Sequence, residues 1–273
     1  MPLTTPLGVW RAGLGLGLAA LWTEPLLGLK RLILPVSYWR AAEFAYVARQ
    51  LQLPRGARVL DLGSPKDLAL LLAAERGFEV VATDILPEAI ELSRRYAAAL
   101  GRCGSGPGSV LSEVQDGRRL TYPDGAFDAA FSVSVLEHIP DDGDLAAARE
   151  LARVVRPGGL VVVTTPYART FGETYVDRAV YERPQVDGKP VFFERHYDDD
   201  ALRRRLLSVP GTEVANLELW GEGAVRGERI LTRLGRLRDA LSPIEAFLSA
   251  AFLRRVENGN STPMAAFFTL KKL

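Results

Sequence analysis

The chain has 273 residues, and its 34 lysines and arginines nearly balance its 33 aspartates and glutamates. A chain of this length can bury a full hydrophobic core, and the balanced charge excludes the strongly basic surface of a typical nucleic-acid-binding domain. A single cysteine, Cys103, excludes an internal disulfide, and two histidines argue against a histidine-based metal site. The sequence therefore predicts a globular protein that binds neither metal nor nucleic acid.

Residues 1–53 are predicted to form a helical cap. An uncharged run from Ala12 to Thr23 is shorter than the roughly 20 apolar residues that cross a bilayer, and the sequence lacks the basic segment of a signal peptide before it. The preferred interpretation is a helix packed on a cytoplasmic protein, and the alternative is a helix that lies at a membrane surface. Ser37 then caps a helix from Tyr38 to about Leu53.

The stretch from Arg58 to Asp67 predicts a strand, a tight turn and the start of a helix. Ser64 before Pro65 is a good helix cap followed by a good first helical residue. Gly63 lets a ligand approach the backbone closely, and the unpaired N–H groups of a helix start suit a carboxylate. Asp61, at the end of the strand, can accept hydrogen bonds from an ammonium group.

A second apolar run, from Phe78 to Thr83, ends in Asp84 about 20 residues after the glycine turn. An acid at this position is the usual partner of ribose hydroxyls. The glycine pattern of dinucleotide sites is absent, because Gly63 is followed by Ser-Pro-Lys-Asp. A pyrophosphate needs several closely approached backbone positions, so this turn favours a nucleoside joined to an amino acid.

The next strands are predicted over Val110–Val114, Phe127–Val133 and, after a Pro-Gly-Gly turn, Leu160–Thr165. Ser132 and Ser134 lie at the end of the fourth strand, facing the expected cleft, and His138 follows them. A histidine there can serve as a general base because its unperturbed pKa lies near neutrality. The alternative is a structural histidine bonded to a backbone carbonyl.

Five stretches follow one another at characteristic spacings, and they are Val59–Gly63, Val81–Asp84, Asp116–Asp128, Ser134–His138 and Leu151–Gly159. Together they resemble the class I S-adenosylmethionine-dependent methyltransferases, in particular the small-molecule branch related to quinone- and lipid-modifying enzymes. The resemblance implies a doubly wound α/β fold, with a mostly parallel seven-stranded sheet and an antiparallel last strand. One departure is the turn after Gly63, where the family usually has two more glycines.

The resemblance also implies S-adenosylmethionine as the cofactor. It assigns the amino-acid end to the first turn, the ribose to Asp84 and the adenine to Asp116. An aromatic or arginine near the third predicted helix often covers the methionine end in this family, and the alternative is a buried aromatic and a surface arginine. The expected cofactor residues are Asp61, Gly63, Ser64, Asp84, Ile85, Asp116, Gly117, Ser132, Tyr38 and Arg40.

Residues 168–197 form a long connection rich in aromatics, which in the resembled family helps to wall the substrate pocket. His196 is the second candidate base. Arg195, Tyr197 and Tyr167 are the candidate substrate contacts, and the alternative is that Arg195, His196 and Tyr197 simply fix the loop.

An insertion at about 222–258 separates the sixth strand, Glu213–Trp220, from the last strand, Met264–Leu270. Apolar residues at helical spacing interleave with arginines, which predicts amphipathic helices. Three interpretations stay open: a basic face over a core-packing stripe, a homodimer contact, or a lid that touches a lipid or an anionic membrane.

Residues 54–273 are therefore predicted to be a methyltransferase domain that acts on a small, apolar or lipid-like acceptor by in-line displacement. Proximity and alignment supply much of the acceleration, so a base is optional. The alternatives are a non-catalytic relative that binds the cofactor, or a nicotinamide-dependent reductase or epimerase. The absence of the dinucleotide glycine pattern argues against the last of these.

Overall fold

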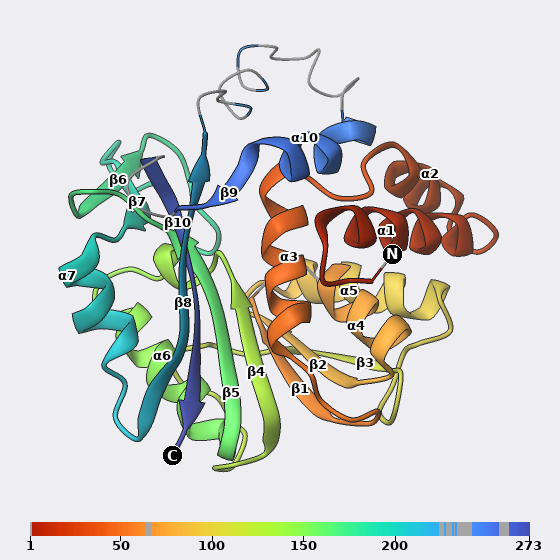
Figure 1. The fold of residues 1–273 in the computed structure, drawn as a ribbon, viewed down its shortest axis with the longest axis horizontal. Helices are drawn as coiled ribbons and strands as arrows, with labels where there is room; N and C mark the ends of the chain where they lie inside the picture. The colour runs from red at the N-terminus through yellow and green to blue at the C-terminus, as the bar shows by residue number, and fades with distance from the viewer. Residues whose placement is uncertain are drawn as a thin grey trace.

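The structure is a computed structural model that describes residues 2–63, 67–223, 227, 231, 233, 242–256 and 262–273. These residues form three layers, in which one large sheet carries helices on both faces (Figure 1). The strand order in the sheet is β3-β2-β1-β4-β5-β10-β8-β9. The strands, in chain order, are β1 Arg58–Leu62, β2 Glu79–Asp84, β3 Val110–Val114, β4 Phe127–Val133, β5 Val155–Pro166, β8 Thr212–Glu222, β9 Leu253–Arg255 and β10 Thr262–Lys272.

The first five strands of the large sheet run parallel, and β10 lies antiparallel between β5 and β8. The predicted mostly parallel sheet with an antiparallel last strand is confirmed. The predicted count of seven strands is wrong, because the described sheet has eight. The additional strand, β9, has three residues that pair with the end of β8 and lies inside the predicted insertion.

Both faces of the parallel strands are buried, since neighbouring residues along a strand point to opposite sides. On β1, Val59 packs into one core cluster and Leu60 into the other. The helices of the first cluster are α1 Pro6–Ala20, α3 Tyr38–Gln50, α4 Asp67–Arg76 and α5 Pro87–Ala99, with α2 Pro25–Ile33 packed beside α1. Helices α6 Gly143–Val154 and α7 Asp199–Leu202 contribute to the second cluster.

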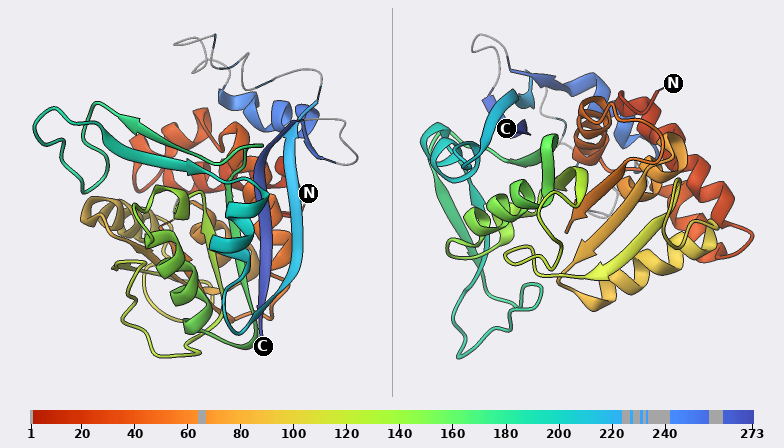
Figure 2. Two further views of the ribbon diagram at one scale, coloured as in Figure 1. Left: turned by 90° about the vertical axis from the view of Figure 1, so that its left-hand side faces the viewer. Right: turned by 90° about the horizontal axis from the view of Figure 1, so that it is seen from below.

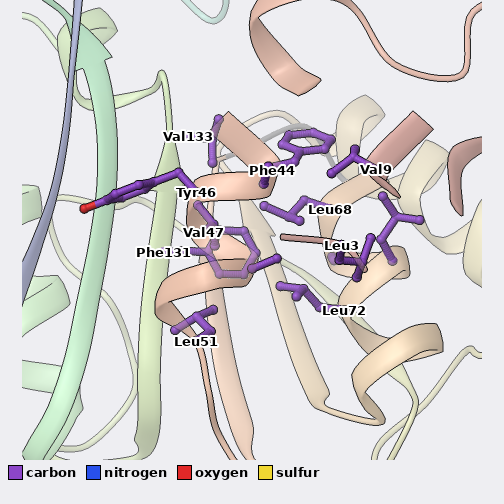
Figure 3. Close-up of a cluster of buried hydrophobic side chains, with 14 of the residues drawn as sticks. Leu3, Val9, Phe44, Tyr46, Val47, Leu51, Leu68, Leu72, Phe131 and Val133 are labelled. Atoms are coloured by element: carbon purple, nitrogen blue, oxygen red, sulfur yellow. The ribbon is translucent and has the colours of Figure 1, made fainter. Parts of the chain in front are cut away.

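Helix α3 lies at the centre of the first cluster. Phe44 and Val47 gather with Leu68 and Leu72 of α4 and with Val9 of α1 (Figure 3). Residues three and four apart share one helix face, so α3 presents an apolar stripe to the sheet and to α4. The N-terminal helices therefore share a core with strand β1 and hold the carboxyl edge of the sheet from one side.

The connection over 168–197 contains a two-stranded sheet that periodicity did not reveal. Strands β6 Gly172–Val176 and β7 Val191–His196 pair antiparallel and project beyond the main sheet (Figure 2). Most side chains of β6 are exposed, so no apolar alternation marks it in the sequence. Strand β5 begins at Val155 rather than Leu160, with a register shift against β4 at its start.

Most of the predicted insertion at 222–258 lies outside the described residues. Its described part includes the short helix η4 Ser242–Ile244 and helix α10 Glu245–Phe252, which packs on α3 and α1. Two further short helices are η1 Leu136–His138, which follows β4, and η2 Arg203–Leu207, which follows α7. Among the described residues, no helix is both long and apolar enough to cross a bilayer.

Candidate active site

The carboxyl ends of the parallel strands meet at one edge of the sheet, and a cleft opens there. Gly63 follows β1, Asp84 ends β2 and Asp116 follows β3, and all three line this cleft. The cleft also contains His138 from the short helix η1 after β4. Of the expected cofactor residues, the structure brings Gly63, Asp84, Ile85, Asp116 and Gly117 together in it.

Gly63 lines the cleft with a backbone conformation that any other residue could adopt only with strain. Its φ is +64°, and a Cβ there would lie 2.6 Å from Cγ1 of Val135. Its N–H donates to the carbonyl of Thr83 at 2.8 Å, which ties the turn to β2. A Cβ on Gly117 would likewise lie 3.0 Å from Cδ1 of Leu62. The two glycines therefore let the backbone of the cleft pack closely against Val135 and Leu62.

The two acids of the cleft are held by local hydrogen bonds. Asp84 Oδ1 accepts the backbone N–H of Leu86 at 3.0 Å. Asp116 accepts three donors from Arg118, of which Nη2 lies 2.7 Å from Oδ2. These hydrogen bonds hold the pKa of Asp116 below its usual range, so this carboxyl is anionic at neutral pH. Arg118 also lines the cleft and had no recognisable signal in the sequence.

Three expected cofactor residues have other contacts. Asp61 is fully buried at the end of β1, just before the residues that line the cleft. Ser132 is buried as well, and its hydroxyl donates to the carbonyl of Leu62 at 3.1 Å. Tyr38 is buried and donates its hydroxyl to Glu222 Oε1 at 2.8 Å, which joins α3 to β8. Ser64 lies outside the described residues.

A second cavity adjoins the cleft and shares Ser134 and His138 with it. Its lining is rich in titratable groups, namely Arg40, Glu43, Glu137, His138, Glu194 and His196. Ser132 and Ser134 were both expected at this edge, and only Ser134 reaches the two cavities. Ser134 has a φ of +49°, and this unusual backbone turns the chain from β4 toward η1.

Glu43 lines the second cavity and accepts hydrogen bonds from three of its neighbours. Its Oε1 accepts the hydroxyls of Ser134 at 2.6 Å and Thr164 at 2.9 Å, and its Oε2 pairs with Arg40 Nη1 at 2.6 Å. Sequence reasoning missed this residue. The available signal was that Glu43 is the only acidic residue in helix α3, amid alanines and aromatics.

His138 is held between two aromatic rings and one carbonyl. Its Nδ1 lies 2.8 Å from the carbonyl oxygen of Phe193, and the rings of Phe193 and Tyr181 lie 5.1 and 5.4 Å away. Burial lowers the pKa of His138, so the neutral imidazole is favoured. The Nδ1 proton then donates to the carbonyl and leaves Nε2 as an acceptor. The carbonyl contact of the structural interpretation is present, and it leaves one nitrogen available for chemistry.

Two other titratable groups line the second cavity. Glu137 is buried, and burial raises its pKa to about 8. Its Oε1 lies 3.9 Å from His138 Nε2, and its Oε2 accepts the hydroxyl of Thr165 at 3.4 Å. His196 Nε2 lies 3.1 Å from Glu194 Oε1, and this hydrogen bond raises the pKa of His196. The second candidate base therefore also reaches this cavity.

The expected substrate contacts make structural contacts instead. Arg195 is 2% exposed and donates to the carbonyls of Ile139 and Asp141, both at 2.5 Å. Tyr197 donates its hydroxyl to Asp144 Oδ2 at 2.8 Å, and Tyr167 donates to Asp199 at 2.9 Å. None of the three lines the cleft or the second cavity. The contacts of Arg195 and Tyr197 match the alternative interpretation, in which these residues hold the connection over 168–197 in place.

Comparison with known proteins agrees with this geometry. Residues 60–163 match a family model described as a methyltransferase domain. The matched residues run from β1 to β5. A 2-methyl-6-phytyl-1,4-hydroquinone methyltransferase of Synechocystis sp. is 35% identical over 114 residues, 41% of this chain and 32% of that protein. A ubiquinone biosynthesis O-methyltransferase of Xanthomonas campestris pv. campestris is 35% identical over 127 residues, 44% of this chain and 47% of that protein.

The matches to these two relatives therefore span between a third and a half of the relatives' own lengths. Among solved structures, a SAM-dependent methyltransferase from Methanosarcina mazei superposes with a TM-score of 0.55 at 18% identity, covering 82% of this chain and 96% of that one. The [4+2]-cyclase SpnF superposes with a TM-score of 0.55 at 21% identity, covering 87% of this chain and 84% of that one. At these identities the likeness concerns the fold of the methyltransferase domain.

The cofactor implied by the sequence resemblance is S-adenosylmethionine, and the residues of the cleft fit it. Acids end β2 and follow β3, where a ribose and an adenine need hydrogen-bond acceptors. Gly63 and Gly117 line the same cleft and contribute no side chain to it. The cleft thus has the acceptors that an adenosine needs, and the second cavity adjoins it at Ser134 and His138.

Proposed function

We propose that this protein transfers a methyl group from S-adenosylmethionine to a small-molecule acceptor that binds in the second cavity. The observation that carries the proposal is that Ser134 and His138 line both the cleft and the second cavity. A donor in one space and an acceptor in the other would meet beside His138. Alignment of two bound reactants can account for much of the acceleration in such a transfer.

The cleft residues have distinct roles in this proposal. Asp84 accepts hydrogen bonds from the ribose hydroxyls, and Asp116 accepts one from the adenine amino group. Gly63 and Gly117 let the nucleoside lie against the backbone. When bound, S-adenosylmethionine supplies a sulfonium methyl group that is open to in-line attack. The residues of this chain orient it and keep the neighbouring space dry.

His138 is the proposed general base. Its Nδ1 is committed to the carbonyl of Phe193, so Nε2 is the nitrogen that can accept a proton. Nε2 would accept the proton that an acceptor hydroxyl releases when its oxygen takes the methyl group, with S-adenosylhomocysteine as the leaving group. Glu137 Oε1 lies 3.9 Å from Nε2, and its raised pKa makes it a neutral neighbour of the imidazole at neutral pH. His196 lines the same cavity and is the second candidate for a contact to the acceptor.

The lining of the second cavity refines the expected acceptor. The sequence predicts an apolar or lipid-like molecule, yet Glu43, Glu137 and Glu194 all line this space. Carboxyl groups at the cavity wall suit a reacting end that bears hydrogen-bond donors. Trp39 and Met264 line the same cavity and offer apolar contact. A hydroxylated ring with an apolar substituent, as named for the Synechocystis relative, has both properties.

Peripheral membrane contact is part of the same proposal. Trp22 between α1 and α2 is 92% exposed, and Leu26 on α2 is 83% exposed. Leu29 and Ile33 continue an outward apolar stripe along α2, beside the exposed Lys30. Co-sedimentation with vesicles that contain an anionic lipid should fall when Trp22 and Leu26 are both changed to Ser. Dimerisation through this stripe, seen as a concentration-dependent mass in light scattering, would instead favour the homodimer.

The central test is binding of S-adenosylhomocysteine, followed by turnover. Isothermal titration should show one site, and Asp84→Ala should weaken it by at least about tenfold, because it removes charge-assisted hydrogen bonds. Labelled methyl transfer is then measured across hydroquinones, catechols, phenols and amines. Absence of binding by the intact protein would overturn the cofactor assignment.

The second candidate is a protein that binds the cofactor without methyl transfer. The turn after Gly63 lacks the two further glycines of the family. A structural neighbour named as a [4+2]-cyclase also has this fold, so the fold alone does not decide the chemistry. Binding of S-adenosylhomocysteine without labelled product from any acceptor in the panel would favour this candidate.

A further inference from the structure

An ion pair joins the N-terminal helices to the start of α4. Arg31 on α2 places Nη2 2.5 Å from Oδ1 of Asp67, the first residue of α4. The guanidinium also lies over the ring of Tyr96 at 5.3 Å. Burial raises the pKa of Asp67, and the neighbouring Arg31 opposes this shift. The pair joins the cap to the turn where the sequence departs from the family.

A third cavity lies beside this ion pair. Arg31, Arg40 and Asp67 line it together with Gly63 and Asp84. Because Gly63, Asp84, Ser134, His138 and Tyr181 also line the cleft, the two spaces are continuous. Asp116 and Gly117 line only the cleft. A nucleoside with its base at Asp116 and its ribose at Asp84 would therefore extend its 5′ substituent past Gly63 toward the arginines.

The 5′ substituent of S-adenosylmethionine ends in an α-amino acid, whose carboxylate needs hydrogen-bond donors in a half-buried space. In the resembled family, additional glycines let backbone N–H groups approach this end. Here the chain has Gly63 alone of those glycines. Positive side chains are a direct substitute, because a guanidinium can donate two parallel hydrogen bonds to a carboxylate.

Arg31 has donors available for this role. Its Nη2 is used by Asp67, whereas its Nε is buried and has no hydrogen-bond partner among the residues that the structure describes. Arg40, the other arginine of the third cavity, already pairs with Glu43 at 2.6 Å. Asp67 holds the Arg31 guanidinium beside the cavity, so little side-chain freedom is lost when a second carboxylate binds.

We propose that Arg31 binds the α-carboxylate of S-adenosylmethionine and that Asp67 acts as its positioning residue. The cap helices thereby supply the charge that the altered turn cannot supply through glycine backbone. This inference rests on the proposed function, since it concerns the amino-acid end of the same cofactor. It predicts that the cap contributes to cofactor selectivity between ligands with and without an amino-acid tail.

The test compares two ligands on the full chain. S-Adenosylhomocysteine has the amino-acid tail, and 5′-methylthioadenosine keeps the nucleoside and the thioether but lacks it. By isothermal titration, Arg31→Gln should weaken S-adenosylhomocysteine by about tenfold to a hundredfold, the usual effect of losing a charge-assisted contact. Binding of 5′-methylthioadenosine should change by less than about twofold. The unchanged ligand reports that the variant is folded.

Two control variants sharpen the result. Arg95→Gln removes the exposed ion pair between α5 and Glu24, which joins the same cap to the domain away from the third cavity. It should leave the affinity ratio of the two ligands unchanged. Arg31→Lys retains the charge and should restore part of the preference for S-adenosylhomocysteine. If Arg31→Gln weakens the binding of both ligands equally, or of neither, then Arg31 has a purely structural role. Either result would overturn the inference.

Failure of the proposed function would give a different pattern of ligand binding from failure of the Arg31 inference alone. If the unsubstituted protein binds neither ligand, the cleft does not hold an adenosine and both proposals fall. If it binds both ligands and Arg31→Gln does not change their ratio, only the role of Arg31 falls.

Discussion

His138 Nδ1 lies 2.8 Å from the carbonyl oxygen of Phe193, so a strand of the projecting hairpin orients the imidazole beside the sheet edge. The two residues are 55 positions apart in the chain. This contact fixes the tautomer, because a carbonyl can accept a hydrogen bond only from a protonated Nδ1. The β6–β7 hairpin therefore helps to position His138 in the candidate active site.

The first prediction concerns His138 as a base. His138→Gln should lower kcat for a hydroxyl acceptor by about a hundredfold or more, the usual contribution of general base catalysis. Affinity for S-adenosylhomocysteine should change by less than about threefold. Steady-state kinetics and titration measure the two quantities separately. The matched variant His196→Gln, in the same cavity, should have the smaller effect on kcat.

The pH profile gives an independent check on the same residue. Burial lowers the pKa of His138, so the neutral base persists to a pH below the usual value of about 6.5. The logarithm of kcat should therefore rise with pH and level off with an apparent pKa under about 6.5. A limb centred well above that value would point to another group as the base.

Glu137 should make folding stability depend on pH. Burial raises its pKa to about 8 in the folded protein, against about 4.3 in an unfolded chain. Between those values the unfolded chain has lost the proton and the folded protein keeps it. The free energy of unfolding should therefore fall as pH rises from about 4.5 to about 8, by a few kcal/mol at most.

Glu137→Gln removes this titration while keeping the shape of the side chain. Urea denaturation from pH 5 to pH 9 should show a flatter dependence in the variant, with the largest gain in stability at about pH 8 to 9. The exposed Glu88 on α5 provides the control, and Glu88→Gln should leave the slope as in the unsubstituted protein. An identical slope in Glu137→Gln would mean that Glu137 is ionised in the folded state.

The sheet and the cleft were predictable because their signals are local. Val110–Val114 and Phe127–Val133 are observed as the sequence predicts, since each is a short run of largely apolar residues bounded by polar or turn residues. Asp84 follows from its position at the end of a strand, and Asp116 follows from the family resemblance. Parallel topology then brings the ends of these strands to one edge, which needs no information about side-chain packing.

Glu43 and Arg31 were not predictable in the same way. Glu43 meets Thr164 across 121 positions of sequence, and Arg31 meets Asp67 only because α2 packs near α4. Both contacts depend on how the cap docks, and an isolated charged residue in a helix carries no signal of its partner. Tyr38, in contrast, was expected near the cofactor and instead bonds Glu222 on β8, because α3 rotates this side chain toward the sheet edge.

Arg195 is predicted to act through stability rather than substrate binding. Its guanidinium lies 2.9 Å from Glu173 and bonds two backbone carbonyls, so Arg195→Met would leave buried acceptors without a donor. Loss of about 3 to 5 kcal/mol is expected, as for removal of one partner from a buried ion pair. Arg204→Met, at an exposed position of η2, should stay within about 0.5 kcal/mol. Equilibrium denaturation by urea measures both.

The last prediction concerns Gly63, which lines the cleft. Gly63→Ala should reduce affinity for S-adenosylhomocysteine by at least about tenfold, for two physical reasons. The left-handed backbone at φ +64° costs an alanine roughly 1 kcal/mol or more, and the new Cβ would meet Val135 at 2.6 Å. The double variant Gly63→Ala/Val135→Ala removes the clash and keeps the backbone strain, so it should recover only part of the affinity. Full affinity in Gly63→Ala would show that the ligand does not approach this turn, and complete recovery in the double variant would assign the whole effect to the clash.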